Sequence, residues 1–457
     1  LLITNLSSDP TQADLYYTPD TGDPGTSGFD CTQVRFASLI VPGSDVASLM
    51  DPVGQLFGLE GSGQLEIRSS RIGQLRVQSV VDAPAPGGGS FGFQLPTVKS
   101  GEGARQNVPY SVVGVQQGAT YRTNLILTET SGQPASVTVN LYDETGKPIG
   151  SGQRDLPPYG KKQFGMAELA GSKAVNAGAL EIIANPGSAG SVAGVVTVID
   201  GRTGDASSFL AKPLKSMTTA KSYAIPSVVV SSTFKSRVEI RNNDTKPVTY
   251  TLRYAGSTGP LTSAPRTLAP RAEVAWDSVL QEVFELSPTS FGPLFIDSDS
   301  PNLSIVSRVY SEQATGSYGD AIEGYAQDDP TTTGESGRII LTDGLEGTAD
   351  NDKSRGARTN LIMTEIGGGT AELEVSIWEK TEKRASPVGT LTVKLGPNEQ
   401  KQINDLFGTE GFGIGSKDRL NVLCTIRPRA GATGKVIAVA TRIDNKTQDT
   451  KNLILRP

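Results

Sequence analysis

Apolar and polar residues alternate along short stretches of the chain, and the stretch around Leu125 shows this pattern clearly. Leu125 and Leu127 alternate with their neighbours, and a second alternating run follows at 137–141 after a short turn. A period of two is typical of a β-strand with one buried face. The turn residues at 143–146 come next. The pattern predicts two antiparallel strands, which we expect to pair with each other as a meander.

The same pattern occurs four times along the chain. Residues 121–130 read YRTNLILTET and residues 357–365 read ARTNLIMTE, while 236–242 is a weaker copy and 1–5 a truncated one. The copies are about 120 residues apart, which is the usual size of one domain. We therefore predict one module used four times. The predicted modules are residues 1–101, 102–217, 218–331 and 332–457.

A proline after the third predicted strand and a short helical turn recur in the modules. Proline cannot donate to a ladder, so it should mark a strand end or an edge. The helical turn is clearest at 277–284, where the apolar residues form a stripe, and 48–51 and 404–407 occupy the same place. Short strands with Gly, Pro and Asp turns predict an all-β fold of four tandem antiparallel β-sandwiches, each with one short helical turn. The four prolines are Pro42, Pro158, Pro270 and Pro397.

An additional apolar segment precedes three of the four repeats and predicts a leader strand. These segments are 108–113, 224–230 and 338–342, and the first repeat has none. Either its leader precedes Leu1, or another chain supplies the strand by β-strand addition. The joins between repeats are short and rich in Gly, Pro and Asp, so we expect an elongated rod with limited bending.

Composition and charge exclude several classes of function. The net charge of −6 and the isoelectric point near 5.1 argue against a nucleic-acid partner. No apolar run is long enough to predict a transmembrane segment. The sequence contains no histidine, which excludes Ser-His-Asp and Cys-His catalytic arrangements and imidazole metal sites. We expect no cofactor and no catalytic residues.

Three motifs carry a resemblance to a known family. They are Arg-Thr-Asn-Leu at 122–125, Leu-Pro-Pro at 156–158 and the Ile-Asp-x-x-Thr-x-Asp pattern at 199–205. Together they resemble tandem immunoglobulin-like or fibronectin-like β-sandwich modules of secreted bacterial proteins. The resemblance covers the second and fourth repeats well, and the first and third only through their strand pattern. It implies immunoglobulin-like sandwiches and an exported protein, and it carries no catalytic residues over.

Acidic residues in the turns offer metal candidates and a simpler interpretation. Asp350 and Asp352 are calcium candidates at a predicted junction, although the region lacks an EF-hand pattern and solvated turns explain both residues. Asp200 and Asp444 end equivalent strands before similar loops. We expect each of them to accept hydrogen bonds from its own turn.

The aromatic residues and cysteines supply candidate contact residues. Trp378 follows inward-facing Ile377 and so should point outward, and Tyr16 and Tyr17 are adjacent, so these three are candidates for stacking on a glycan or a partner. Cys424 alternates with Val422 and Ile426 and should be buried, whereas Cys31 should lie in a loop or at the surface. A disulfide between Cys31 of one chain and Cys424 of another would join copies end to end. It requires Cys424 to be accessible.

Two functions fit these patterns. The first is a non-catalytic structural or adhesive protein, extracellular or on the cell surface, whose rod of four modules self-associates into a filament or surface layer. The alternative is an accessory region of an exported bacterial protein that binds a glycan or another protein, with a conspicuous aromatic or polar patch on one repeat only. A free-standing enzyme has little support, because no catalytic constellation is present in the sequence.

Overall fold

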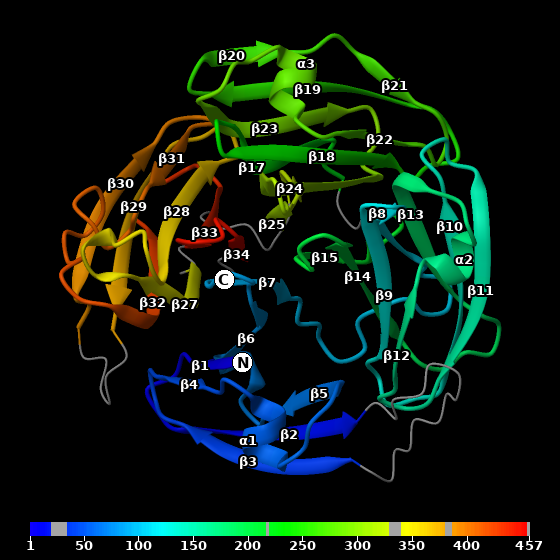
Figure 1. The fold of residues 1–457 in the computed structure, drawn as a ribbon, viewed down its shortest axis with the longest axis horizontal. Coiled ribbons are helices and arrows are strands. Elements are labelled where there is room, and N and C mark those ends of the chain that lie inside the picture. The colour runs from blue at the N-terminus through cyan, green and yellow to red at the C-terminus, as the bar shows by residue number, and fades with distance from the viewer. Residues whose placement is uncertain (20–33, 216–218, 329–339, 380–385, 455–457) are drawn as a thin grey trace.

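The fold is almost entirely antiparallel β-sheet, which confirms the predicted class. We describe it from a computed structural model that covers residues 1–19, 34–215, 219–328, 340–379 and 386–454. Every strand pairing within these ranges is antiparallel, and the strands fall into four consecutive groups (Figure 1). The predicted module boundaries remain predictions, and two of them, 217/218 and 331/332, lie outside the described ranges.

The first group forms two small sheets around Ile3, Leu15 and Val41. One sheet has the strand order β4-β1-β6-β7, and the other has the order β3-β2-β5. The elements are β1 (Leu2–Asn5), β2 (Thr11–Pro19), β3 (Arg35–Val41), β4 (Val46–Ser48), α1 (Pro52–Phe57), β5 (Gly63–Arg68), the 3-10 helix η2 (Ile72–Gln74), β6 (Leu75–Pro84) and β7 (Ser90–Leu95).

The second group adds a leader strand to the same arrangement. Its sheets have the orders β11-β10-β13-β8-β16 and β12-β9-β14-β15, and they enclose a larger apolar core. The elements are β8 (Tyr110–Gln117), β9 (Tyr121–Glu129), β10 (Ala135–Tyr142), β11 (Pro148–Leu156), β12 (Lys161–Gly165), α2 (Ala167–Ala170), β13 (Val175–Ala184), β14 (Val192–Asp200), β15 (Ala206–Leu210) and β16 (Lys212–Pro213).

The third group follows the second, but a backbone pairing of Val230 with Lys235 links all its strands into one sheet. The elements are β17 (Ser222–Val230), β18 (Phe234–Asn242), β19 (Val248–Gly256), β20 (Gly259–Thr262), β21 (Arg266–Leu268), β22 (Glu273–Trp276), α3 (Val279–Phe284), β23 (Ser290–Ser298), β24 (Leu303–Gln313), β25 (Gly316–Glu323) and β26 (Tyr325–Ala326).

The fourth group again has two sheets, β27-β32-β29-β30 and β31-β28-β33-β34. Residues 404–407 are bends and turns here, so the expected helical turn is wrong for this repeat. Gly408, Gly411 and Gly413 follow closely, and glycine disfavours helix propagation. The elements are β27 (Ile340–Gly347), the 3-10 helix η3 (Ala349–Asn351), β28 (Ala357–Glu365), β29 (Ala371–Trp378), β30 (Gly389–Leu395), β31 (Gln400–Ile403), β32 (Arg419–Pro428), β33 (Val436–Asp444) and β34 (Thr450–Ile454).

The two alternating strands around Leu125 and Val139 do not pair, which corrects the expected meander. β9 pairs with β12 and β14, whereas β10 pairs with β11 and β13 in the facing sheet. The chain changes sheets at Glu129, whose buried carboxylate accepts hydrogen bonds from the backbone of Ser131 at 2.7 Å and Tyr159 at 2.9 Å. Glu365 does the same in the fourth repeat, for Gly367 and Asn398.

The four groups form a closed ring, so the expected rod is wrong. The last main strand of each group, β7, β15, β25 and β34, lies near the axis of the ring (Figure 1). β15 packs against β7 and β25, and β34 packs against the same two strands, which closes the circle. Contacts between the first and fourth groups, such as the packing of β34 on β7, complete the ring.

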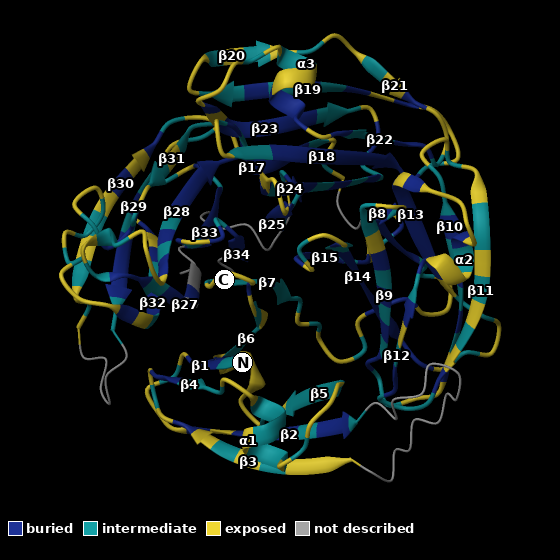
Figure 2. Cartoon of the chain, viewed as in Figure 1, coloured by how far each residue is buried: buried dark blue, intermediate teal, exposed yellow. Residues whose placement is uncertain are grey.

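The burial of a strand depends on its place in the ring. The strands at the interfaces between groups, such as β18 and β28, are largely buried, whereas β3 on the outside of the first group is mostly exposed (Figure 2). No helix among the described residues is long and apolar enough to cross a membrane.

Candidate functional site

Asp200, at the end of β14, joins the second repeat to the third. Its Oδ1 accepts a hydrogen bond from the backbone N of Arg202 at 2.8 Å, as expected for a turn residue. Its Oδ2 accepts from the backbone N of Ser317 at 2.9 Å and from the Ser317 hydroxyl at 2.8 Å. Burial alone would raise the pKa of Asp200, but the hydrogen bonds from Arg202 and Ser317 outweigh it and lower the pKa to about 2.

Asp444 occupies the same position in the fourth repeat and closes the ring. Its Oδ1 accepts from the backbone N of Lys446 and of Thr447, both at 2.9 Å, and so fulfils the expected turn role. Its Oδ2 accepts from the backbone N of Ser90 at 2.8 Å and from the Ser90 hydroxyl at 3.2 Å. One carboxylate therefore orders its own loop and binds a strand more than 350 residues away in sequence.

Three further aspartates lie buried around the axis, and we call them the axial aspartates: Asp205, Asp320 and Asp449. Asp205 accepts from the backbone N of Gly319 at 2.8 Å and from Arg308 at 3.4 Å. Asp449 accepts from the backbone N of Gly92 at 3.0 Å, and Asp320 accepts from that of Asn452 at 2.9 Å. Each axial aspartate therefore binds a strand of a neighbouring repeat.

Burial sets the protonation of the axial aspartates. It raises the pKa of Asp205 to about 7, although Arg308 opposes the shift, and it raises the pKa of Asp320 to about 7 against two backbone hydrogen bonds. Burial also raises the pKa of Asp449 well above its usual value, and the nearby Asp205 adds to the shift. The cavity beside Arg308 encloses about 10 Å³, room for one water molecule. These groups are arranged to hold strands together.

The outward side of the first repeat carries an apolar patch, which we call the contact face: Phe36 and Ile40 on β3 with Tyr16 on β2. Phe36 is 58% exposed and Ile40 60%. The rings of Tyr16 and Phe36 lie 5.1 Å apart, and the guanidinium of Arg68 lies 4.4 Å from the Tyr16 ring.

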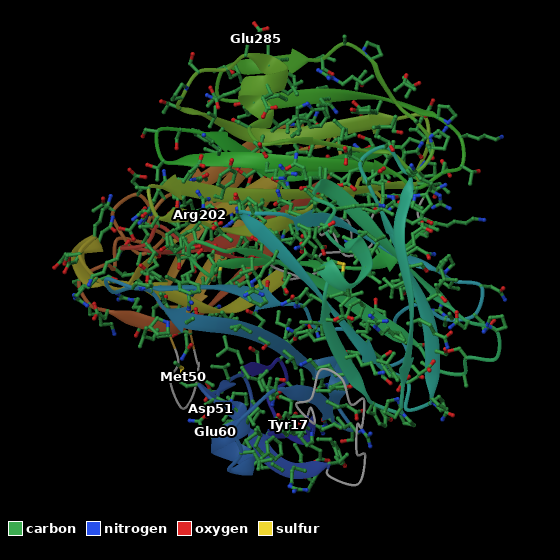
Figure 3. The ribbon with its side chains drawn as sticks, turned by 45° about the vertical axis from the view of Figure 1, so that its right-hand side comes forward. Tyr17, Met50, Asp51, Glu60, Arg202 and Glu285 are labelled. Carbon is green, nitrogen blue, oxygen red and sulfur yellow. The ribbon has the colours of Figure 1, made fainter. Side chains whose placement is uncertain are left out.

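The first repeat as a whole exposes more large apolar side chains than the other three. Of eleven such side chains exposed among the described residues, seven belong to it. One of them, Met50, lies with Glu60 at the end of the molecule opposite Glu285 of the third repeat (Figure 3). Exposed apolar residues concentrated on one part of a surface are typical of an interaction site. The seven are Leu6, Val34, Phe36, Ile40, Met50, Ile72 and Val81.

The predicted aromatic residues have different environments. Tyr17 is only 2% exposed and stacks on Phe57, so its predicted role in a surface contact is wrong. It faces the core because Tyr16 and Tyr17 alternate across β2. Trp378 is half-buried, and its Nε1 donates to the Thr425 hydroxyl at 3.1 Å. Of the three, Tyr16 lies on the contact face.

The calcium candidates Asp350 and Asp352 lie at a 3-10 turn of the fourth repeat. Asp352 accepts from the backbone and hydroxyl of Ser354 and from Arg355, and Asp350 lies exposed nearby. The described part of the chain holds no group of three or more acidic or cysteine side chains placed for a metal ion.

Cys424 is fully buried, as its alternation predicts, and burial raises the pKa of its thiol to about 12. A thiol in this position is not accessible to a second chain, so the structure contradicts its use in a disulfide between copies. Cys31 lies outside the described residues.

Sequence reasoning missed the axial aspartates, and it missed Ser317 and Ser90, the serines that donate to Asp200 and Asp444. A sequence pattern that could have identified two of these aspartates was present, because the loops 199–205 and 443–449 are close copies that both end in Asp. The pattern indicated only a shared turn, because the second partner of each carboxylate lies in a different repeat.

Comparison with known proteins adds little. No family model matches the chain, and no curated protein does. Among solved structures, the chain is 13% identical to a tetra-tandem repeat in the extending region of a large adhesion protein, over 99% of this chain and 93% of that one, with a TM-score of 0.12. Escherichia coli alpha-2-macroglobulin activated by porcine elastase is 10% identical, over 98% and 41%, also with a TM-score of 0.12. TM-scores this low carry no argument about fold or function.

Proposed function

We propose that this protein is a non-catalytic structural or adhesive protein of the cell exterior that self-associates through its first repeat. The observation that carries the proposal is the concentration of exposed apolar side chains there, seven of the eleven among the described residues. The ring supports the proposal, because it makes the four repeats one body that presents this repeat at its rim. The extracellular location rests on the family resemblance of the sequence motifs.

A second copy is the partner that the contact face fits best. Phe36 and Ile40 lie on β3, which ends the sheet β3-β2-β5 among the described residues, so this edge and the patch lie together there. Two copies related by a twofold axis would cover each other's apolar patch, and edge-to-edge pairing would extend the sheet. A filament or layer would need a second, different contact on the ring.

The proposal predicts that the contact face controls association. Changing Phe36→Ser together with Ile40→Thr should weaken self-association at least about tenfold, because both side chains lose apolar area that the contact buries. Light scattering and sedimentation velocity over a range of concentrations measure this, with negative-stain electron microscopy of the parent protein.

The matched control is Phe291→Ser with Leu420→Thr, which removes two exposed apolar side chains from other repeats. It should associate like the parent. A parent protein that stays monomeric at all concentrations, or a control that loses association as much as the first pair, would contradict the proposal.

One observation favours the alternative of glycan binding. The exposed Phe36 ring and the half-buried Tyr16 ring form a pair beside Arg68, and such rings can stack on a sugar. A monomeric parent that binds a glycan array, and loses this binding on Phe36→Ser, would establish the alternative.

A further inference from the structure

The strand β5 of the first repeat has an open edge where the other repeats have a paired one. β13, β23 and β32 are its equivalents, and each pairs with the leader strand of its own repeat: β8, β17 and β27. β5 pairs with β2 on one side and ends its sheet on the other, as far as the described residues show. An open strand edge presents unpaired backbone groups that can accept another strand.

The core residues beneath this edge are also less buried than their equivalents in the other repeats. Leu65 and Ile67 of β5 are only half-buried. The strand registers identify their equivalents, because Leu15 pairs with Ile67 as Val139, Leu252 and Val375 pair with theirs. All six equivalents have 0% exposure: Leu180, Leu294 and Cys424 for Leu65, and Ile182, Ile296 and Ile426 for Ile67.

The facing sheet has a second opening next to the first. β1 pairs with β6 at four positions, from Leu2 with Gln78 to Asn5 with Leu75, whereas the corresponding strands of the other repeats pair at nine. In the part of the chain that the structure describes, residues 79–84 of β6 therefore pair only with β7. Val81 is 45% exposed here, while its equivalent Val198 is 4% exposed.

We propose that a strand joined to the amino-terminal side of Leu1 completes the first repeat by pairing antiparallel with β5. In the second and third repeats two consecutive strands fill the equivalent places: β8 turns through 118–120 into β9, and β17 turns through 231–233 into β18. A second copy is a poorer source, because β8, β17 and β27 are already paired within their own repeats.

Leu1 stands at the point where such a pair of consecutive strands would join β1. By the strand registers it occupies the position of Leu125, Val238 and Leu361, and its N donates to the Leu49 carbonyl at 2.8 Å, as a backbone amide could. The segment before it would extend β1 along β6, turn, and return along β5 with an apolar side chain opposite Leu65. Val112 and Ile225 hold the corresponding place in β8 and β17.

The completing strand would also fill the contact between the first and second repeats. β8 packs against β18 and β24 of the next repeat, and β17 packs against β28 and β33. In each case the leader strand packs on the same two strands of the following repeat. The completing strand of the first repeat would therefore lie on β9 and β14, which are those two strands in the second repeat. Ile126 of β9 is half-buried there, while its equivalents Glu239 and Ile362 are 3% and 7% exposed. This inference goes beyond the proposed function and does not depend on the contact face.

A chimera tests the proposal, because the chain supplies its own donor sequence. Residues 105–124 of the second repeat, fused directly before Leu1, reproduce the natural join of Asn124 to Leu125. We expect amide exchange at Leu65 and Ile67 to slow at least about tenfold. The thermal midpoint should rise by roughly 3 °C or more.

Two controls separate strand addition from a nonspecific effect of the extension. The same fusion with Val112→Asp and Val115→Asp should leave exchange at β5 unchanged, because its inward side chains no longer fit the core. The unmodified segment added as a free peptide tests the source of the strand. Protection by the free peptide without protection in the chimera would overturn the covalent connection, and protection in neither would overturn strand addition altogether.

Discussion

The carboxylates of Asp200 and Asp444 each order two parts of the chain at once. One oxygen accepts from the turn that follows the strand, and the other accepts from a serine of a different repeat, Ser317 or Ser90. The local role is common for aspartate in turns. Because of the second role, the stability of the contact between repeats depends on one side chain, since a backbone N–H buried at that contact is costly to leave unpaired.

We predict that Asp444→Ala opens the contact between the first and fourth repeats. The change should lower the free energy of unfolding by ~2 kcal/mol, since it leaves the Ser90 and turn amides without an acceptor. Amide exchange at Ser90 and Gly92 should become faster. Urea denaturation and hydrogen exchange measure the two effects.

The matched control is Asp143→Ala, because Asp143 accepts only within its own turn, from Thr145 and Lys147. It should cost no more than ~1 kcal/mol and leave exchange at Ser90 unchanged. Unchanged exchange at Ser90 in Asp444→Ala would show that the ring does not depend on this carboxylate.

A second kind of contact joins strands of adjacent repeats. It consists of charged side chains that are buried where the strands meet. Arg241 of β18 has a fully buried side chain, and it donates to the Glu181 carboxylate of β13 at 2.8 Å. Arg271 donates to the same oxygen at 2.8 Å. Burial lowers the pKa of Arg241, and the negative charge of Glu181 opposes this shift. Such a group is costly without its partner, so the two strands depend on each other.

Glu181→Ala should therefore destabilise the protein by ~3 kcal/mol, because it leaves a buried guanidinium uncompensated. The comparison is Glu168→Ala, which removes an exposed partner of Arg154 and should cost less than ~1 kcal/mol. Chemical denaturation of both variants gives the difference. Equal effects would mean that the buried pair contributes no more than a surface pair.

At the scale of the whole molecule, the ring brings the axial aspartates together, and their protonation links its stability to pH. An aspartate in the unfolded chain has a pKa of ~3.9. In the folded protein, burial raises the pKa of Asp205 and of Asp320 to about 7, because it disfavours their charge. The folded state therefore binds more protons than the unfolded state between these values, so stability decreases as pH rises.

We predict that the free energy of unfolding falls by ~3 kcal/mol or more between pH 5 and pH 8. Below pH ~4 the trend should reverse, because Asp200 has its pKa lowered to about 2 and its contribution disappears on protonation. Thermal denaturation from acidic to basic pH measures both the decrease in stability above pH 5 and its reversal at lower pH. Asp320→Asn should flatten the decrease, since asparagine carries no charge at any of these pH values. A stability that is constant or rises from pH 5 to 8 would contradict the prediction.

Much of the fold was predictable because its signals are local. Alternation at 137–141 gives a strand, a proline after Leu156 ends one, and the recurrence of Arg-Thr-Asn-Leu gives the repeat. Cys424 was correctly placed in the core by its period of two. Alternation does not state which sheet a strand joins, and so β9 and β10 were wrongly expected to pair.

The sequence alone determined the β class, the repeated unit and the leader strands, because period-two patterns and turn residues act within a few positions. Only the tertiary structure decided that the repeats close into a ring, that Asp444 binds Ser90, and that Leu65 and Ile67 lie under an open edge. These features depend on contacts between residues far apart in the chain, such as Gly92 with Asp449. No local pattern records such a contact, since either partner alone is an ordinary turn or strand residue.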